Sequence, residues 1–355
     1  MRLAPTPPDP RAPPLRVDLY SDTHTRPTTA MRAAMTAAEV GDEQHGDDPT
    51  VNALCARMAD LLGKEAAVFL PSGTMCNEVA ILAHCRPGDE VLAHRTAHIV
   101  AAEAGAPGAL AGVLVTALDG PRGQFDAATL QAAIREPRRH APPQALLVVE
   151  QTSNLGGGAV WPVEQLRAVA AIAHAHGLAT HMDGARLLNA AAALDISARD
   201  LAEHYDSVWL DFTKGLGAPL GAVLAGSEAF IDAAWRWKQR LGGALRQAGI
   251  CAAGCLYALD HHVARLAEDH ENARALARGL AQIDGIGVEL PETNLVFFDT
   301  AETGLEAQEV AARVRRNGVA ISVMGRYRAR ACLHLGVARA DIDTALAAVR
   351  AAVAR

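Results

Sequence analysis

The sequence predicts an α/β protein in which a large domain with a mainly parallel sheet precedes a smaller C-terminal α+β domain. Between residues 50 and 240, short apolar or β-branched runs alternate with longer segments of helical periodicity, the pattern of parallel strands joined by helices. After residue 249 the pattern changes to helix, short strands and a final helix. We therefore expect a large domain over residues 16–249 and a small domain over residues 250–355.

The elements follow in order from these patterns. Six of the first 15 residues are proline, which disfavours a helix and predicts an extended N-terminal arm over residues 1–15. Apolar residues at helical spacing over 51–62 predict a helix, the run 66–70 predicts a strand, and Ser72-Gly73-Thr74 opens a new helix. The same criteria predict strands over 90–93, 145–149, 178–182 and 207–211, and helices over 163–176, 227–240 and 340–353.

Composition and charge exclude several classes of protein. With 4% aromatic residues and a formal net charge of -7, the chain lacks the basic, aromatic surface of a nucleic-acid-binding protein. No apolar run approaches the roughly 18 residues of a membrane span, and no signal-peptide pattern opens the chain. The six cysteines are scattered, so we expect a cytoplasmic protein. We expect Cys251 and Cys255 to be buried small hydrophobes, and no metal site.

Polar residues gather at the ends of the predicted strands. Thr74 follows the strand 66–70, Asp183 follows 178–182 and Lys214 follows 207–211. Ligands of open α/β sheets bind outside the carboxyl ends of the strands, so these three residues could line one crevice.

Lys214 is the first candidate for chemistry. Gly215, Gly217 and Pro219 follow it, so little side-chain bulk surrounds its amine. A desolvated lysine amine is a nucleophile that forms Schiff bases with carbonyl compounds, including pyridoxal phosphate (PLP). Taken alone, the pattern favours an ordinary surface lysine in a glycine-rich turn.

Asp183 and the turn Ser72-Gly73-Thr74 supply what a PLP-binding lysine needs. PLP withdraws electrons only while its ring nitrogen is protonated, and a carboxylate beside that nitrogen keeps it so. One strand-helix-strand unit separates Asp183 from Lys214, which places both at neighbouring strand ends. The small-residue turn at a helix start presents backbone N–H groups to a phosphate. The three elements together are far more specific than any one of them.

Five segments of the chain carry a recognisable pattern: Val17 to Thr23, Val40 to Val51, Leu70 to Met75, His181 to Leu187, and Lys214 to Pro219. Together they resemble the threonine aldolase and β-eliminating lyase family. The resemblance runs from about residue 16 to the C-terminus and is densest before about residue 250. It implies the aspartate-aminotransferase-type fold (fold type I) and PLP as the cofactor.

The resemblance also implies roles toward the cofactor. Lys214 bonds covalently to PLP, Asp183 binds its ring nitrogen, and His98 stacks on its ring. The residues that hold the phosphate are Ser72, Gly73 and Thr74. Arg246 matches an arginine that reaches this phosphate from a neighbouring subunit, which implies a homotetramer of paired dimers with shared active sites. Gln239 stands where a lysine is expected in that segment, and Lys238 or Arg240 could substitute for it.

Three further residues match positions that grip the carboxylate of an amino-acid substrate: Ser21, Arg186 and Arg330. An arginine suits this role because its planar fork binds a carboxylate through two hydrogen bonds. Arg330 is placed by the segment Arg330 to His334, and Arg326 and Arg328 are close competitors for the same role.

Two departures from the family pattern concern the reaction itself. Ser153 stands where the family has a histidine that reaches the β-hydroxyl of the substrate, and serine cannot act as a base near pH 7. His45 stands where the family usually has tyrosine. We hypothesise that His45 or an ordered water takes the β-hydroxyl proton, and that the space beside Ser153 accepts substituents other than methyl.

The predicted activity is retro-aldol cleavage of a β-hydroxy-α-amino acid to glycine and an aldehyde, by a PLP-dependent carbon–carbon lyase. One alternative keeps PLP but breaks another bond, by β-elimination from a β-substituted amino acid, which gives a keto acid and ammonia. A second alternative is a non-enzymatic PLP-fold regulator. Product analysis separates the first two, and absence of turnover on any amino acid would favour the third.

Overall fold

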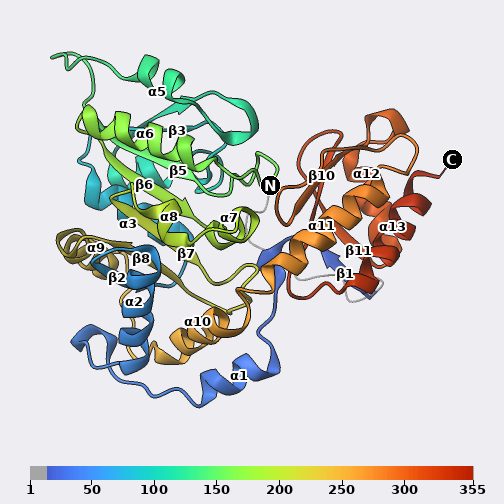
Figure 1. The fold of residues 1–355 in the computed structure, drawn as a ribbon, viewed down its shortest axis with the longest axis horizontal. Helices are drawn as coiled ribbons and strands as arrows, with labels where there is room; N and C mark the ends of the chain where they lie inside the picture. The colour runs from blue at the N-terminus through green and yellow to red at the C-terminus, as the bar shows by residue number, and fades with distance from the viewer. Residues whose placement is uncertain (1–13, 355) are drawn as a thin grey trace.

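A seven-stranded sheet forms the centre of the large domain in the computed structural model, which describes residues 14–354. The predicted arm over residues 1–15 therefore lies almost wholly outside the described residues. The strand order is β2-β8-β7-β6-β5-β3-β4, and Figure 1 labels all of these strands except β4. The bounds are β2 (Ala66–Leu70), β3 (Glu90–His94), β4 (Leu114–Leu118), β5 (Gln144–Glu150), β6 (Ala179–Gly184), β7 (Ser207–Asp211) and β8 (Ala222–Gly226). All pairs from β4 to β7 are parallel, and β8 is antiparallel to both of its neighbours, which confirms the mainly parallel sheet.

Helices cover both faces of this sheet, as a parallel sheet requires. The helices of this part of the chain are α1 (Thr29–Thr36), α2 (Pro49–Leu62), α3 (Gly73–His84), α4 (His98–Ala101), α5 (Ala127–Ala133), α6 (Val163–Ala175), α7 (Leu187–Leu194), α8 (Ala198–Ala202), α9 (Glu228–Arg240) and α10 (Gly249–His261). Of these, α1 packs on α10, and α10 packs on α2. The predicted strands 66–70 and 207–211 have the bounds of β2 and β7, and the predicted helices fall on α2, α3, α6 and α9.

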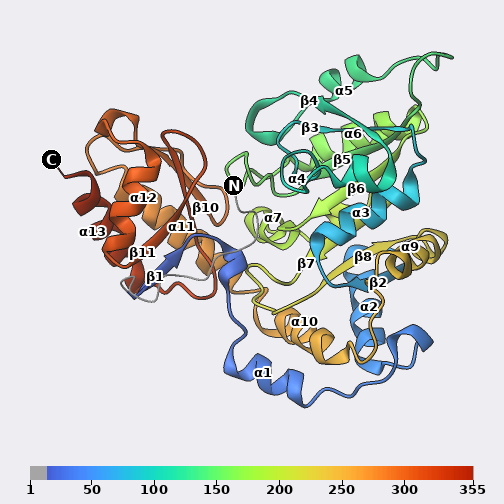
Figure 2. The same cartoon turned by 180° about the vertical axis from the view of Figure 1, so that it is seen from behind.

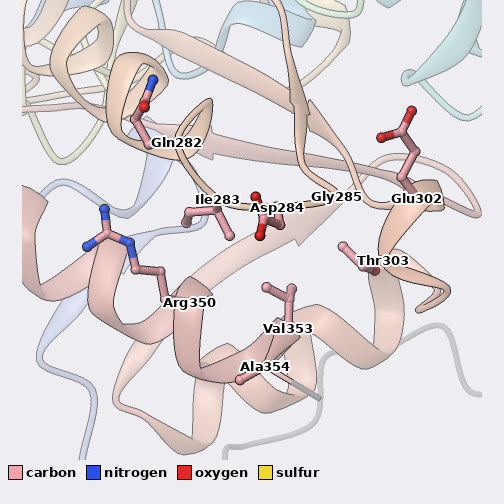
Figure 3. Close-up of a pocket in the computed structure, with 9 residues that line it drawn as sticks. All are labelled: Gln282, Ile283, Asp284, Gly285, Glu302, Thr303, Arg350, Val353 and Ala354. Carbon is pink, nitrogen blue, oxygen red and sulfur yellow. The ribbon is translucent and has the colours of Figure 1, made fainter.

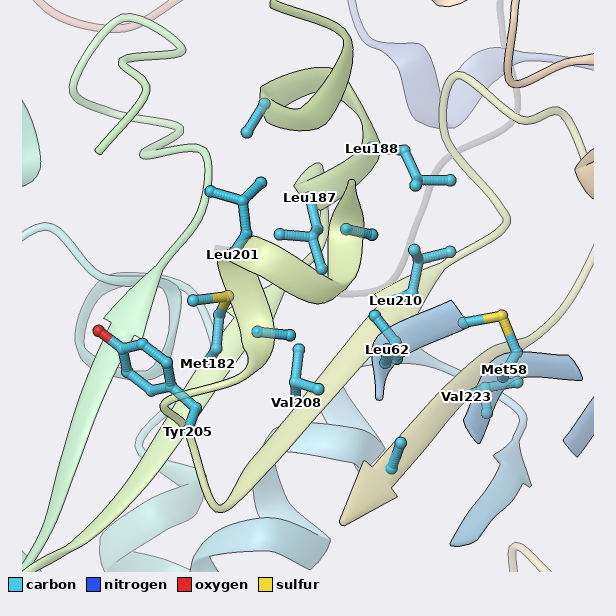
Figure 4. Close-up of a cluster of buried hydrophobic side chains, with 14 of the residues drawn as sticks. Met58, Leu62, Met182, Leu187, Leu188, Leu201, Tyr205, Val208, Leu210 and Val223 are labelled. Atoms are coloured by element: carbon cyan, nitrogen blue, oxygen red, sulfur yellow. The ribbon is translucent and has the colours of Figure 1, made fainter. Parts of the chain in front are cut away.

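Aliphatic side chains fill the space between the sheet and its helices. On one face, Met58 and Leu62 of α2 join Met182 of β6 and Val208 of β7 in the main core (Figure 4). On the other face, α3 and α9 pack on β7, β8 and β2. The start of α3 is thereby held against the centre of the sheet, although β2 lies at its edge.

A second sheet of five strands forms the smaller domain, in the order β1-β11-β12-β10-β9. Its elements are β1 (Val17–Leu19), β9 (Gly287–Val288), β10 (Leu295–Asp299), β11 (Val319–Val323), β12 (Arg328–Cys332), and the helices α11 (Leu266–Leu280), α12 (Ala307–Arg316) and α13 (Arg339–Val353). Figure 2 shows β1, β10 and β11 of this sheet beside α11, α12 and α13. β1 pairs in parallel with β11, so this sheet takes a strand from the start of the predicted large domain. The boundary at residues 249 and 250 stays a prediction. No helix within residues 14–354 has the length and apolar character needed to cross a membrane.

Candidate active site

The predicted site residues meet where β6 and β7 end. These strands are parallel neighbours, and Asp183 of β6 pairs in register with Trp209 of β7. Lys214 follows β7 after a short turn. A Cβ atom added to Gly73 would lie 2.1 Å from Cη2 of Trp209, so only glycine permits the start of α3 to approach this ring. The structure thus brings Gly73, Asp183 and Lys214 to one end of the sheet.

Lys214 is held at both its amine and its backbone. Its Nζ lies 3.1 Å from Oδ2 of Asp211, the last residue of β7, and the side chain is only 16% exposed. Thr25 Oγ1 donates to the Lys214 carbonyl at 2.8 Å, which fixes the turn that carries the lysine. The amine also lies 5.8 Å from the centre of the Trp209 ring.

Asp183 is buried next to a second carboxyl group. Its Oδ2 accepts from Asn77 Nδ2 at 2.9 Å and its Oδ1 from the Ala185 N–H at 3.1 Å. Its register neighbour on β5 is Glu150. Burial and the Asp183 charge raise the pKa of Glu150 to about 7. Burial also raises the pKa of Asp183, although Lys214 opposes this shift. These two carboxyls therefore form a site that favours a positive partner.

His98, the first residue of α4, lies beside these carboxyl groups. Its backbone N–H donates to Glu150 Oε2 at 2.6 Å, and its Nδ1 lies 2.7 Å from Oε1 of the buried Glu103. The hydrogen bond to Glu103 raises the pKa of His98, and the charges of Asp183 and Glu150 act in the same direction. The Glu103 carboxylate, bound to Nδ1, thus orients the His98 ring.

Arg186 meets Asp22 in a buried, two-pronged ion pair. Its Nε and Nη2 donate to Oδ2 and Oδ1 of Asp22, each at 2.7 Å. Burial alone would raise the pKa of Asp22, but the Arg186 guanidinium outweighs burial and holds it well below its usual range. Neither bond uses Nη1 of Arg186. Asn294, which precedes β10 of the small sheet, also donates to Asp22 at 3.1 Å. Arg186 follows β6 of the large sheet, so the ion pair of Arg186 with Asp22 links the two domains.

Arg330 is the buried one of the three competing arginines. From β12 it donates to Ser322 Oγ at 3.1 Å and to Asn154 Oδ1 at 2.8 Å. Burial lowers the pKa of Arg330, and the nearby charge of Arg186 lowers it further. Arg326 is exposed and paired with Glu306, while Arg328 stacks on Phe297.

Ser21 and Ser153 are both buried, but their hydroxyl groups have different neighbours. Ser21 begins a short 3₁₀ helix (Asp22–His24), and its Oγ accepts from the Thr23 N–H at 3.2 Å. The Ser153 hydroxyl lies close to the backbone at Gly123, since a Cβ atom added to Gly123 would sit 1.8 Å from the Ser153 Oγ.

His45 and Arg246 lie together at another place, on facing loops. Both pair with Asp42, His45 at 3.4 Å and Arg246 at 2.9 Å, and the His45 side chain is 72% exposed. Within residues 14–354, none of their ion pairs or hydrogen bonds involves Lys214 or Asp183. The single chain does not bring these two residues into the site.

Lys238 and Arg240 both contact partners within the same chain. The Lys238 amine is fully buried in an ion pair with Glu43, and the Arg240 guanidinium stacks on Trp237, 4.4 Å from the ring centre. Lys238 is therefore not available to replace the lysine expected at Gln239.

A separate hollow of about 570 Å³ lies in the small domain. It is bounded by the turn at Asp284 and Gly285, by Thr303, and by Arg350 and Val353 of α13 (Figure 3). It contains none of the predicted site residues.

Comparison with known proteins places this geometry in a family. The model of the β-eliminating lyase family matches residues 18–303. The chain belongs to the β-eliminating lyase family. Over 344 residues it is 39% identical to low-specificity L-threonine aldolase 1 of Arabidopsis thaliana, covering 95% of this chain and 96% of that protein. It is 38% identical over 340 residues to the low-specificity L-threonine aldolase of Escherichia coli K12, covering 96% of this chain and all of that protein.

A solved structure agrees with the fold of this lyase-family chain. A threonine aldolase from Leishmania major superposes with a TM-score of 0.81 at 22% sequence identity, covering 96% of this chain and all of that one. The predicted aspartate-aminotransferase-type fold (fold type I) is thereby confirmed.

Several residues of this site were missed by reasoning from the sequence: Asn77, Glu103, Glu150, Asp22 and Trp209. Asp22 lies inside the segment Val17 to Thr23, Glu150 lies three positions before Ser153, and Asn77 lies one helical turn after Gly73. Proximity to a motif was the available signal, but none of these residues reveals its partner without the fold.

Proposed function

We propose that the protein is a PLP-dependent aldolase that cleaves β-hydroxy-α-amino acids to glycine and an aldehyde, with L-threonine, L-allo-threonine or bulkier analogues as substrates. The observation that carries this proposal is the meeting of Lys214 and Asp183 at the ends of neighbouring parallel strands. The names of the Arabidopsis and E. coli relatives, which align over nearly the whole chain, support the same activity.

The residues present fit PLP on two grounds. The buried carboxyls of Asp183 and Glu150 lie side by side, and a protonated ring nitrogen would supply the positive partner that they favour. At the start of α3, Ser72 Oγ caps the Met75 N–H at 3.2 Å, while the first backbone N–H groups of a helix have no acceptor inside it and suit a phosphate. When bound, PLP stabilises negative charge at the substrate Cα.

The chain's own residues would then orient the substrate and move its proton. Arg330 and Nη1 of Arg186 would bind the substrate carboxylate beside Ser21, holding the amino acid in one orientation. Breaking the Cα–Cβ bond requires that the β-hydroxyl lose its proton. We assign this role to His98, because Glu103 holds its Nδ1, so that Nε2 is the ring nitrogen that would take the proton.

We propose further that two subunits complete each active site. In support, Arg246 and His45 lie on exposed, mutually packed loops of the single chain, where Glu43 N–H donates to the Arg246 carbonyl at 3.0 Å. From a neighbouring subunit of a homotetramer, Arg246 would reach the phosphate. His45 likewise remains a candidate base only if it reaches the site from a neighbouring subunit.

We also propose a reducing cytoplasm as the location of the enzyme. All six cysteines fall within residues 14–354 and none is paired, as expected where thiols stay reduced.

The deciding test is glycine release from PLP-loaded protein given L-threonine, L-allo-threonine, phenylserine and 3-hydroxyaspartate, together with their D-forms. We expect glycine and the matching aldehyde from at least one L-isomer. Keto acid and ammonia without glycine would establish β-elimination instead, the activity for which the family is named. A panel without any product would overturn both.

A further inference from the structure

Asn77, to which the roles above give no function, lies at the centre of a buried polar network. Its Nδ2 donates to Asp183 Oδ2 at 2.9 Å and to Glu103 Oε1 at 2.8 Å. Its Oδ1 lies 2.7 Å from Trp209 Nε1 and 3.2 Å from His181 Nε2. An indole nitrogen only donates, so the orientation of the amide is fixed, and its two donors and two acceptor sites are all used.

Glu103 links this amide to His98. Its Oε1 accepts from Asn77 and lies 2.7 Å from His98 Nδ1, and its side chain is fully buried. An ionised carboxylate only accepts, so the proton of this bond belongs to Nδ1 of His98. The neutral ring therefore keeps its lone pair on Nε2, the nitrogen turned away from Glu103.

Glu78 is the neighbour of Asn77 on α3 and is 3% exposed. Within residues 14–354, neither of its carboxyl oxygens has a hydrogen-bond partner, and neither does Oε2 of Glu103. Two ionised carboxylates cannot bond to each other, because both only accept, but one proton on Glu78 turns the pair into donor and acceptor. Burial and the neighbouring Glu103 carboxylate both raise the pKa of Glu78, which favours a proton on this side of the pair.

We propose that Asn77, Glu103 and Glu78 act together as positioning residues of the active site. Glu78 gives a hydrogen bond to Oε2 of Glu103, Glu103 holds the Nδ1 proton of His98, and Asn77 joins this pair to Asp183. The network fixes which nitrogen of His98 faces the substrate and ties the charge of His98 to that of Asp183. This inference rests on the proposed function, since it assumes that His98 and Asp183 serve the reaction.

The first test replaces Glu103 by glutamine, which keeps its shape and removes its charge. The matched control is Glu90→Gln, because Glu90 is equally buried but pairs with Arg135 at the start of β3. Asp183 and Glu150 also face His98 and stay unchanged. In Glu103→Gln we expect kcat to fall roughly tenfold to a hundredfold with little change in KM. We also expect the acid limb of the pH profile of kcat to move to lower pH, since His98 loses the hydrogen bond that raises its pKa.

A second pair of variants tests the proton on Glu78. Glutamine at this position keeps the length and a donor for Glu103, whereas leucine removes the donor. Without that donor the Glu103 carboxylate holds the Nδ1 proton of His98 more strongly, so Glu78→Leu is expected to move the acid limb to higher pH, opposite to Glu103→Gln. Glu78→Gln is expected to match the unmodified enzyme within about twofold. Equal effects of glutamine and leucine would overturn the role of the Glu78 proton.

Absorption of bound PLP and its affinity for the protein give readouts that do not depend on aldolase activity. We expect the pH at which the absorption changes to shift in Glu103→Gln and not in Glu90→Gln. In an Asn77→Ala background, the shift that Glu103→Gln produces should be smaller, because the link from Glu103 to Asp183 is gone while the direct charge of His98 on Asp183 remains. If the unmodified protein released no glycine, the proposed function would fail while these measurements still tested the network. Identical spectra for Glu103→Gln and Glu90→Gln would overturn the network.

Discussion

Two buried ionic clusters lie in the same site, and they are balanced differently. In the arginine cluster, Asp22 and Arg186 form a two-pronged pair of opposite charges, and Arg186 lowers the pKa of Asp22 against the effect of burial. In the carboxyl cluster, Asp183 and Glu150 stand on neighbouring strands, and burial raises the pKa of both. In the arginine cluster the protein itself supplies both charges of the ion pair. The carboxyl cluster carries negative charge only, so it favours a positively charged ligand.

The difference indicates how the site would orient its ligands. A surplus of positive charge at Arg186 and Arg330 suits the carboxylate of an amino acid. A surplus of negative charge at Asp183 and Glu150 suits a protonated ring nitrogen. Electrostatics alone thus gives the site a direction, before any specific contact is made.

The largest expected effect comes from replacing Lys214, the proposed nucleophile. Lys214→Ala should lower turnover by more than about a thousandfold and abolish the absorption of covalently bound PLP. Lys64→Ala is a suitable control, because Lys64 donates to the Ala202 and Tyr205 carbonyls at the far end of β7. Normal catalysis in Lys214→Ala would contradict the assignment of this lysine.

Neutralising the carboxyl cluster should have the next largest effect. Asp183→Asn removes the charge that would keep a ring nitrogen protonated, so we expect kcat to fall about a hundredfold or more and PLP to bind more weakly. Asp206→Asn, a change at an aspartate that bonds to Thr180 and His174, should leave kcat within about threefold of the unmodified value. Similar losses in both variants would count against a special role of Asp183.

Breaking the arginine cluster should affect stability most. Asp22→Asn leaves the buried Arg186 without its counter-charge, so we expect the free energy of unfolding to fall by about 3–5 kcal/mol. The control Asp260→Asn breaks an exposed ion pair with Arg57 and should cost less than about 1 kcal/mol. Chemical denaturation of the PLP-free proteins measures both, and equal losses would refute the contrast.

The two clusters should also respond oppositely to pH. The lowered pKa of Asp22 contributes stability that is present above its unfolded pKa near 3.8 and is lost as pH falls toward its folded value. The pKa of Glu150 rises from 4.5 to about 7, so its ionisation opposes folding increasingly as pH rises through that window. Relative to the unmodified PLP-free protein, Glu150→Gln should therefore gain stability between about pH 5 and about pH 8. A flat difference over that range would contradict this assignment.

The smallest effect is expected outside both clusters. His45→Phe changes an exposed side chain whose ion pair is with Asp42, so turnover should stay within about twofold. A hundredfold loss would instead show that His45 acts on the substrate from a neighbouring subunit. Glycine release from the best substrate distinguishes the two results.

Sequence patterns were sufficient to predict the helices and strands and the strand ends at which the candidate site residues lie. Apolar periodicity and turn residues predicted β2 and β7 to the residue, because both depend on local spacing. Partners across the fold could not be read in this way. Lys238 looked available for a phosphate, yet it turns inward to Glu43, which lies 195 positions earlier in the chain. The partnership of His98 with Glu103 and Asn77 likewise requires the packing of α3 against α4 and β6.

The parallel pairing of β1 with β11 has a consequence for how the protein is made. The Arg16 guanidinium donates to the carbonyl of Asn317, 301 positions away, and the first strand pairs beside it. During translation, β1 leaves the ribosome among the first segments but finds its neighbour only when almost the whole chain has been synthesised. Ser21 and Asp22 follow β1 directly, so these two residues reach their final places late, and a stalled nascent chain would contain Lys214 without β1 paired to β11.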